Sequence, residues 1–136
     1  MIQFVLSIFL TWAIVNVLKP IIKWKKSGEI SRRTLAGNGG MPSGHTSLVA
    51  SLATALYLES GFSPLFITSL VLMFIVIYDA VKVRTEIEKQ ARVLNSLLEQ
   101  SGREERLEET VGHSVAEVLV AVVLSIVIPV TVYSLL

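Results

Sequence analysis

Residues 118–136 read VLVAVVLSIVIPVTVYSLL, nineteen residues without one Asp, Glu, Lys or Arg. A helix that rises about 1.5 Å per residue needs roughly 20 apolar residues to cross a hydrocarbon layer of about 30 Å. This stretch therefore predicts a helix that spans a membrane.

Three further stretches of the sequence are equally free of charged residues, at 1–18, 34–58 and 60–78. The second one opens with the glycine-rich segment 36–40, so its helix is expected to start near Pro42, a favoured first helical residue, and to end at Leu58 as a short span. The chain has 136 residues, of which 52% are hydrophobic. We therefore predict an all-α integral membrane bundle of about four transmembrane helices, forming a single domain over residues 1–136.

The overall charge excludes some functions. Twelve Lys and Arg nearly balance eleven Asp and Glu, and there is no cysteine. The chain lacks the basic excess that a nucleic-acid partner requires, and it has neither a thiolate nucleophile nor a thiolate metal site. Any catalysis must depend on His, Ser, Lys, Arg and carboxylates.

The positions of the cations predict an orientation. All twelve Lys and Arg lie in two loops, six within residues 19–33 and six within residues 82–106. Because cytoplasmic loops carry the excess of positive charge, we expect both loops in the cytoplasm and both termini outside, in the inner or plasma membrane. The first apolar stretch lacks a basic n-region and a small-residue cleavage site, so we expect it to be retained as a helix.

The second basic loop has a helical pattern of its own. Its apolar residues recur on one helix face, at Val83, Ile87, Ala91, Leu94 and Leu98. This spacing predicts a cytoplasmic amphipathic helix that continues from the third span and ends near Ser101-Gly102. We interpret the apolar stripe as a packing surface, against the membrane bundle or a second copy, rather than as a ligand site.

A polar motif precedes the second span, Gly39-Gly40-Met41-Pro42-Ser43-Gly44-His45. Free N–H groups in a first helical turn, a serine hydroxyl and a glycine without a side chain form a cradle for an anion such as phosphate. The alternative is a glycine loop and a helix start, with His45 at the membrane interface and no chemistry.

A second motif, Gly112-His113-Ser114-Val115-Ala116-Glu117, precedes the last span. His113 and Glu117 are four residues apart, so a carboxylate can hold one ring nitrogen while the other acts as nucleophile or base. Alternatively, Ser114 and Glu117 form a capping box that adds about 1 kcal/mol of helix stability. Both histidines of the chain thus lie at helix starts on the predicted cytoplasmic side, which favours histidine chemistry on an anionic lipid head group.

An ordered set of short motifs resembles a known family. These motifs are the segment 39–45, Tyr78-Asp79-Ala80, Val83-Arg84, Gln90-Ala91 with Leu94-Asn95, and Gly112-His113. Together with Glu117 they resemble the type 2 phosphatidic acid phosphatase superfamily, which also contains vanadium-dependent haloperoxidases and bacterial acid phosphatases. The longer strings are most similar to its divergent membrane branch.

The resemblance implies a role for each motif residue. His113 would be the nucleophile that forms a phosphohistidine, Glu117 would orient it, and His45 would be the general acid. The implied phosphate-binding residues are Ser43, Gly44, Lys19, Lys26, Arg33 and Arg84. No metal or cofactor is implied. Thr34 and Glu117 depart from the family pattern, which has Pro after the first Arg and Asp as the carboxylate.

These expectations combine into one functional hypothesis. We expect a metal-independent lipid phosphate phosphatase at the cytoplasmic membrane face, acting on phosphatidylglycerophosphate or phosphatidic acid. The alternatives are an isoprenyl (di)phosphate phosphatase and a non-catalytic protein that binds anionic lipid. The expected partners are the bilayer and a second copy of the chain. The homodimer would form through small residues that permit close helix approach, Ser47, Ala50, Ser51 and Thr54.

Overall fold

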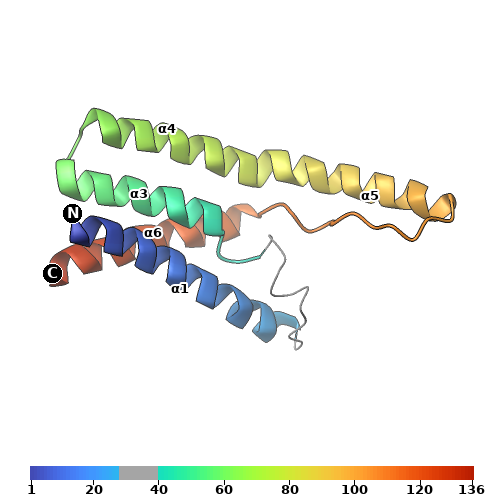
Figure 1. The fold of residues 1–136 in the computed structure, drawn as a ribbon, viewed down its shortest axis with the longest axis horizontal. Coiled ribbons are helices and arrows are strands. Elements are labelled where there is room, and N and C mark those ends of the chain that lie inside the picture. The colour runs from blue at the N-terminus through green and yellow to red at the C-terminus, as the bar shows by residue number, and fades with distance from the viewer. Residues whose placement is uncertain (28–39) are drawn as a thin grey trace.

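The fold is described from a computed structural model, which describes residues 1–27 and 40–136. The helices, labelled as in Figure 1, are α1 (Ile2–Ser27), α3 (Gly44–Ser60), α4 (Pro64–Tyr78), the π-helical turn η1 (Asp79–Val83), α5 (Arg84–Gln100) and α6 (Val115–Leu135). No strand occurs in these two ranges. The expected all-α fold is therefore confirmed.

Three helices in the described part of the chain are long and apolar enough to cross a membrane: Ile2–Lys25, the continuous helix Pro64–Gln100, and Val115–Leu135. The helix α3 has 17 residues, fewer than the roughly 20 that a full crossing requires. Three of the four expected spans thus have the length and composition of membrane-crossing helices, whereas α3 is a shorter fourth member of the bundle. The total of four spans stays a prediction.

The helix α3 occupies the centre of the bundle. It contacts α1, α4 and α6, and α1 also packs against α6. In Figure 1 the continuous helix formed by α4, η1 and α5 extends well beyond the other helices, and residues 101–114 return beside α5 to the start of α6. We call α5 and this returning segment the arm. Both termini lie at the opposite end of the bundle from the arm (Figure 1).

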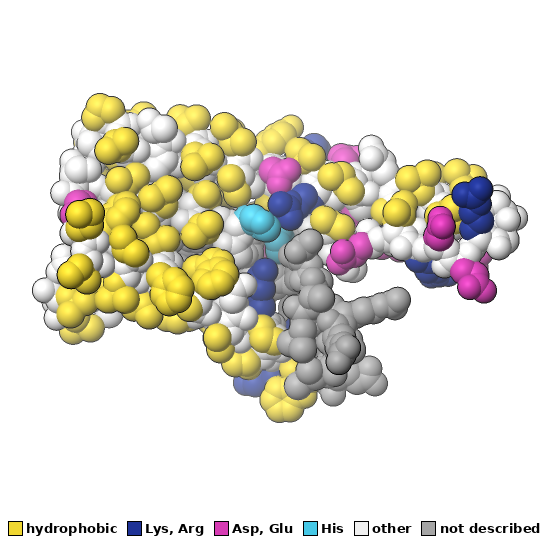
Figure 2. All heavy atoms as spheres, viewed as in Figure 1, with side chains coloured by type: hydrophobic (Ala, Val, Ile, Leu, Met, Phe, Trp, Pro, Cys, Tyr) yellow, Lys and Arg dark blue, Asp and Glu magenta, His cyan; other side chains and the backbone are white. Residues whose placement is uncertain are grey.

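The bundle places small polar side chains inside and large apolar ones outside. Ser7, Thr11, Ser51 and Ser125 have no exposed surface, whereas Phe74 is 71% exposed. Figure 2 shows apolar side chains covering the visible face of the bundle, while charged side chains gather on the arm and where it joins the bundle. This arrangement is typical of helices surrounded by lipid, which associate through close contact between small residues.

The small-residue face expected to form a homodimer is used within the chain. Ser47 and Ser51 have no exposed surface and Ala50 is 3% exposed, and the Ser125 hydroxyl on α6 donates to the Ser47 carbonyl at 3.0 Å. The inference of a dimer from this face was therefore wrong, because small residues permit close approach within a chain as readily as between chains. The homodimer itself stays a prediction.

The start of α3 and the packing of α5 differ from the sequence predictions, whereas the end of α5 agrees with them. The helix α3 begins at Gly44 rather than Pro42, because Ser43 is extended and caps the helix by accepting from the Thr46 N–H. The helix α5 ends at Gln100, as expected, and Gly102 follows with φ of 72°. The predicted stripe of α5 does not pack on the bundle, since Ala91 is buried within the arm and Leu94 is 48% exposed. Its packing against a second copy stays a prediction.

Candidate active site

Four elements that are distant in sequence meet where the arm joins the bundle. The carbonyl of Glu117, in the first turn of α6, accepts from the N–H of Ser43 before α3, at 3.4 Å. Lys19 of α1 reaches the start of α3, since a Cβ on Gly44 would lie 3.3 Å from the Lys19 Nζ. Arg84, at the start of α5, acts electrostatically on both Lys19 and His45. Residues from both predicted motifs therefore share one site.

The carboxylate of Glu117 makes both contacts considered for the second motif, one with the His113 ring and one within the capping box. Its Oε2 lies 3.1 Å from the Nδ1 of His113 and accepts from the Ser114 N–H at 3.2 Å. The Ser114 hydroxyl accepts from the Glu117 N–H in return, so the capping box is present. Because an ionised carboxylate only accepts, the neutral His113 ring carries its proton on Nδ1 and keeps its lone pair on Nε2. The helix cap therefore fixes the tautomer of His113.

The other ring nitrogen of His113 is unusual. Nε2 is buried and has no hydrogen-bond partner in the described part of the chain. Buried polar atoms are nearly always paired, so an unpaired one calls for a specific reason such as catalysis. A lone pair on a buried Nε2, held by a carboxylate on the far side of the ring, is the arrangement that a histidine nucleophile requires.

The backbone around His113 is fixed by the start of the arm. The His113 N–H donates to the Ala80 carbonyl at 3.0 Å. In an α-helix that carbonyl would accept from Arg84, but in η1 the Arg84 N–H bonds to Asp79 instead, five residues back. Gly112 is also required, because a Cβ there would lie 2.7 Å from the Thr85 Oγ1 and 3.2 Å from its backbone. The π-helical turn thus provides the carbonyl that positions His113.

The same π-helical turn positions a cation. The Arg84 Nε donates to the Asp79 Oδ2 at 2.8 Å, across the five-residue spacing of η1. The Arg84 side chain is 21% exposed. Since Asp79 holds the Nε edge of the guanidinium, the pair fixes the arginine near the other positive groups of the site.

His45 lies in the first turn of α3 and is exposed at the mouth of the site. The positive charges of Arg84 and Lys19 act on His45 and disfavour its protonated form. A phosphate bound between these groups would cancel part of that charge. The site therefore combines two different histidines. His45 becomes more basic when an anion binds, and the Nε2 of His113 has no hydrogen-bond partner among the described residues.

The structure places some of the other predicted phosphate-binding residues at the site, whereas others lie outside the described residues. Ser43 is fully buried, and its Oγ accepts from the Thr46 hydroxyl at 2.9 Å as well as from the Thr46 N–H. Ser43 therefore caps α3, and its role as a phosphate ligand stays a prediction. Arg33 and the side chain of Lys26 lie outside the described residues. Of the predicted cations, Lys19 and Arg84 are brought together with the two histidines.

Supporting residues on the arm were missed by the sequence interpretation. The buried Asn95 donates to the Leu107 carbonyl at 3.0 Å and accepts from its N–H at 2.8 Å. Glu88 accepts from the Gly112 N–H at 3.3 Å. Asn95 stood in a quoted family string and next to the apolar stripe, which was the available signal. The sequence spacing between Asn95 and Leu107 did not indicate that these two residues bond to each other.

Comparisons with known proteins agree with this membrane architecture. The chain is 30% identical over 120 residues to the uncharacterized membrane protein YuiD of Bacillus subtilis (strain 168), covering 76% of each chain. No solved structure matches the chain at a significant level. With three apolar helices and a membrane-protein relative, the chain is an integral membrane protein. The family model described as the divergent PAP2 family matches residues 2–128, nearly the whole chain, and the protein therefore belongs to that family.

Proposed function

We propose that this protein is a metal-independent lipid phosphate phosphatase that works through a phosphohistidine on His113. The observation that carries the proposal is the His113 ring, whose Nδ1 lies 3.1 Å from the Glu117 carboxylate and whose buried Nε2 has no hydrogen-bond partner among the described residues. A structural histidine at a helix cap would have no need of an unpaired buried nitrogen. Membership of the divergent PAP2 family supports the same chemistry.

In the proposed first step, the Nε2 lone pair of His113 attacks the phosphorus of a phosphomonoester. The P–N bond forms while the P–O bond to the lipid breaks, and protonated His45 gives its proton to the leaving oxygen. Glu117 stabilises the positive charge that develops on the His113 ring. Because Nε2 has no exposed surface in the resting structure, the covering side chains must move aside as the phosphate enters.

In the second step, neutral His45 takes a proton from water, and the water oxygen attacks the phosphorus. The P–N bond then breaks and inorganic phosphate leaves, which restores the lone pair of His113. Lys19 and Arg84 would hold the charged phosphate oxygens in both steps, since both already act on His45 electrostatically. Ser43 would contribute through the start of α3 rather than through a free hydroxyl.

The proposed topology sets the substrate. We propose that α3 crosses the apolar layer as a fourth span, with His45 at the water boundary, and that the arm and the site lie in the cytoplasm with both termini outside. The basic end of α1, from Lys19 to Lys25, and the arm lie at the same end of the bundle (Figure 1), which supports this orientation. An inner-leaflet phosphomonoester, such as phosphatidylglycerophosphate or phosphatidic acid, then reaches the site laterally. A reporter fused after Leu136 should be extracellular, and a cytoplasmic signal would contradict this topology.

The deciding experiment measures phosphate release in detergent. Wild type, His113→Ala and Glu117→Gln are each offered phosphatidylglycerophosphate, phosphatidic acid, an isoprenyl phosphate and an isoprenyl diphosphate, with a chelator and with vanadate. We expect release that resists the chelator, is blocked by vanadate and disappears in His113→Ala. Glu117→Gln should lower kcat with little change in substrate binding, because the nucleophile is present but poorly oriented. An acid-labile phosphate on His113 should be trapped in rapid quench.

A loss of activity in His113→Ala must be distinguished from a loss of folding. Thermal unfolding in detergent should be similar for wild type and His113→Ala, because the alanine keeps both the Ser114 cap and the backbone bond to Ala80. If no lipid phosphate is hydrolysed by folded wild type, the enzymatic proposal is wrong. The cradle would then be a binding site for anionic lipid, as the non-catalytic alternative holds.

A further inference from the structure

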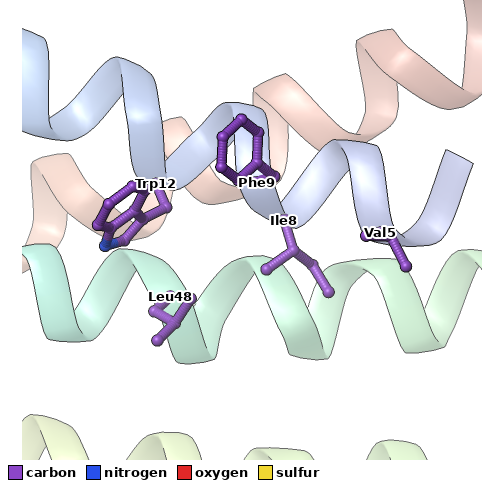
Figure 3. A pocket seen from close by; sticks show the side chains of 5 residues that line it. All are labelled: Val5, Ile8, Phe9, Trp12 and Leu48. Carbon is purple, nitrogen blue, oxygen red and sulfur yellow. The ribbon is translucent and has the colours of Figure 1, made fainter.

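An apolar groove leads away from the proposed phosphate site along α1. It is lined by Val5, Ile8, Phe9, Trp12 and Leu48, with a volume of about 370 Å³. Figure 3 shows the four α1 side chains in a row, with Leu48 across from them on α3. Val5 is 60% exposed and Trp12 is 44% exposed, so the groove opens to the outside of the bundle.

The groove and the phosphate site lie on the same helix faces. On α1, Trp12 is followed by Asn16 and Lys19 at helical spacing, and the side chains of both lie near the position that a Cβ on Gly44 would occupy. On α3, Leu48 is one turn from Gly44 and so lies on the same face. A molecule whose phosphate sits at Lys19 and Gly44 therefore lies on the same helix faces as the groove, which begins at Trp12, about 10 Å farther along α1.

We propose that this groove binds one acyl chain of the lipid phosphate whose head group occupies the site. This inference rests on the proposed function and adds the subsite that selects the lipid tail. The 14 residues from Lys19 to Val5 correspond to about 21 Å at about 1.5 Å per residue. Half of a hydrocarbon layer is about 15 Å, so the groove reaches the depth of one leaflet.

The dimensions favour an acyl chain over a helix of a second copy. A helix with side chains is about 10 Å across and needs a long opposing surface, whereas Leu48 is the single residue of α3 that lines this groove. The lining is wholly hydrocarbon apart from the indole of Trp12. Such a lining selects for apolar area and length rather than for hydrogen-bonding groups.

A chain-length series tests the proposal. Phosphatidic acids of increasing acyl length are compared at equal surface fraction in the same mixed micelles. For wild type, KM should fall with length and then level off once the chain reaches Val5. In Val5→Trp the indole blocks the deep end, so the long-to-short ratio of kcat/KM should fall about tenfold, the size expected when roughly two methylene groups lose apolar contact. Val123→Trp is the matched control.

The control is chosen by exposure. Val123 lies on α6, is 58% exposed, close to the 60% of Val5, and does not line the groove. Its tryptophan variant should reproduce the wild-type length series. If Val5→Trp and Val123→Trp give the same series, the groove does not select the chain, and the proposal is overturned.

A second readout is independent of turnover. Phosphatidic acid with a photoactivatable diazirine at the end of one chain is incorporated into phosphatidylcholine vesicles with His113→Ala protein. Crosslinks should concentrate between Val5 and Trp12, and excess unlabelled phosphatidic acid should compete them away. Labels spread evenly over the lipid-facing residues and insensitive to phosphatidic acid would mean boundary lipid only, and would overturn the proposal. Competed crosslinks without any wild-type turnover would support the groove while rejecting the enzymatic function.

Discussion

The bundle and the arm are held together in opposite ways. Inside the bundle, the buried hydroxyls of Thr11, Ser47 and Ser51 donate to carbonyls of their own helices, and contact between helices depends on small side chains. On the arm, Asn95 and Glu88 bond directly to the backbone of the returning segment. The first region is specified by volume and the second by hydrogen-bond partners.

This difference shows which interactions fix the positions of the site residues in each region. The bundle supplies Lys19 and the start of α3, where close packing of small side chains is joined by two bonds to α6, from Ser43 to Glu117 and from Ser125 to Ser47. His113, by contrast, comes at the end of a segment without regular secondary structure, so its position depends on individual bonds to η1 and α5. We therefore expect added volume to damage the bundle and lost polar groups to damage the arm.

The largest effect should come from the junction between the two regions, with Gly112→Ala. A Cβ there would lie 2.7 Å from the Thr85 hydroxyl and 3.2 Å from its backbone, so His113 must shift. A displacement of about 1 Å at a catalytic group can cost roughly 100-fold in rate, and we expect kcat/KM to fall by about that factor. Phosphate release and thermal unfolding measure the two consequences separately.

The control for this variant is the double variant Gly112→Ala/Thr85→Ala. It removes the hydroxyl contact but not the backbone contact, so activity should recover only in part. Full activity in Gly112→Ala alone would mean that the arm does not set the position of His113, and would remove the distinction drawn between the two regions.

Next in size is the loss of the amide that holds the returning segment, in Asn95→Ala. It removes bonds to both the N–H and the carbonyl of Leu107, which costs about 1–3 kcal/mol locally. Amide exchange at Leu107 should accelerate strongly while exchange within α3 stays slow, and kcat should fall roughly tenfold. Ser96→Ala is the control, because the Ser96 hydroxyl bonds only within α5, to Val93. Equal exchange in both variants would contradict the proposed role of Asn95.

The sequence predicted the bundle better than the arm, for a physical reason. Uncharged stretches and helix starts are local patterns, and they located the helices and both histidines. The bond between Asn95 and Leu107 joins residues 12 apart, and that between Glu88 and Gly112 joins residues 24 apart. The segment between them has no periodicity that fixes a register, so these partners could not be predicted.

Two other features could not be predicted from the sequence, the π-helical turn and the packing partner of the small-residue face. The π-helical turn at Asp79–Val83 is identified by the bond from the Arg84 N–H to Asp79, and no composition signal distinguishes it from α-helix. The small face around Ser47 was visible, but a sequence pattern does not say whether such a face packs within one chain or between two. Contacts between helices decide that: Ser47, Ala50 and Ser51 are buried within the chain, and the Ser47 carbonyl accepts from Ser125 of α6.

A smaller effect is a pH shift in Arg84→Gln, at the base of the arm. If protonated His45 is the general acid, kcat/KM falls as pH rises through the pKa of His45. The positive charge of Arg84 acts on His45 and disfavours its protonated form, so its removal should move the falling limb to higher pH. Lys89→Gln is the control, since Lys89 pairs with Glu86 on the exposed side of α5. An unmoved limb in Arg84→Gln would show that another group is the acid.

The smallest effect should come from the bundle, in Ser125→Ala. The variant removes the hydroxyl bond from α6 to the Ser47 carbonyl, but that carbonyl belongs to a helix and the alanine fits the same space. Bonds of this kind between membrane helices average about 0.6 kcal/mol, so thermal unfolding should change little and phosphate release should stay at the wild-type rate. Ser125→Leu, which adds volume at a residue with no exposed surface, should instead separate α6 from α3 and unfold the protein. If the alanine variant proved the more damaging of the two, the bundle would depend on hydrogen bonds as the arm does.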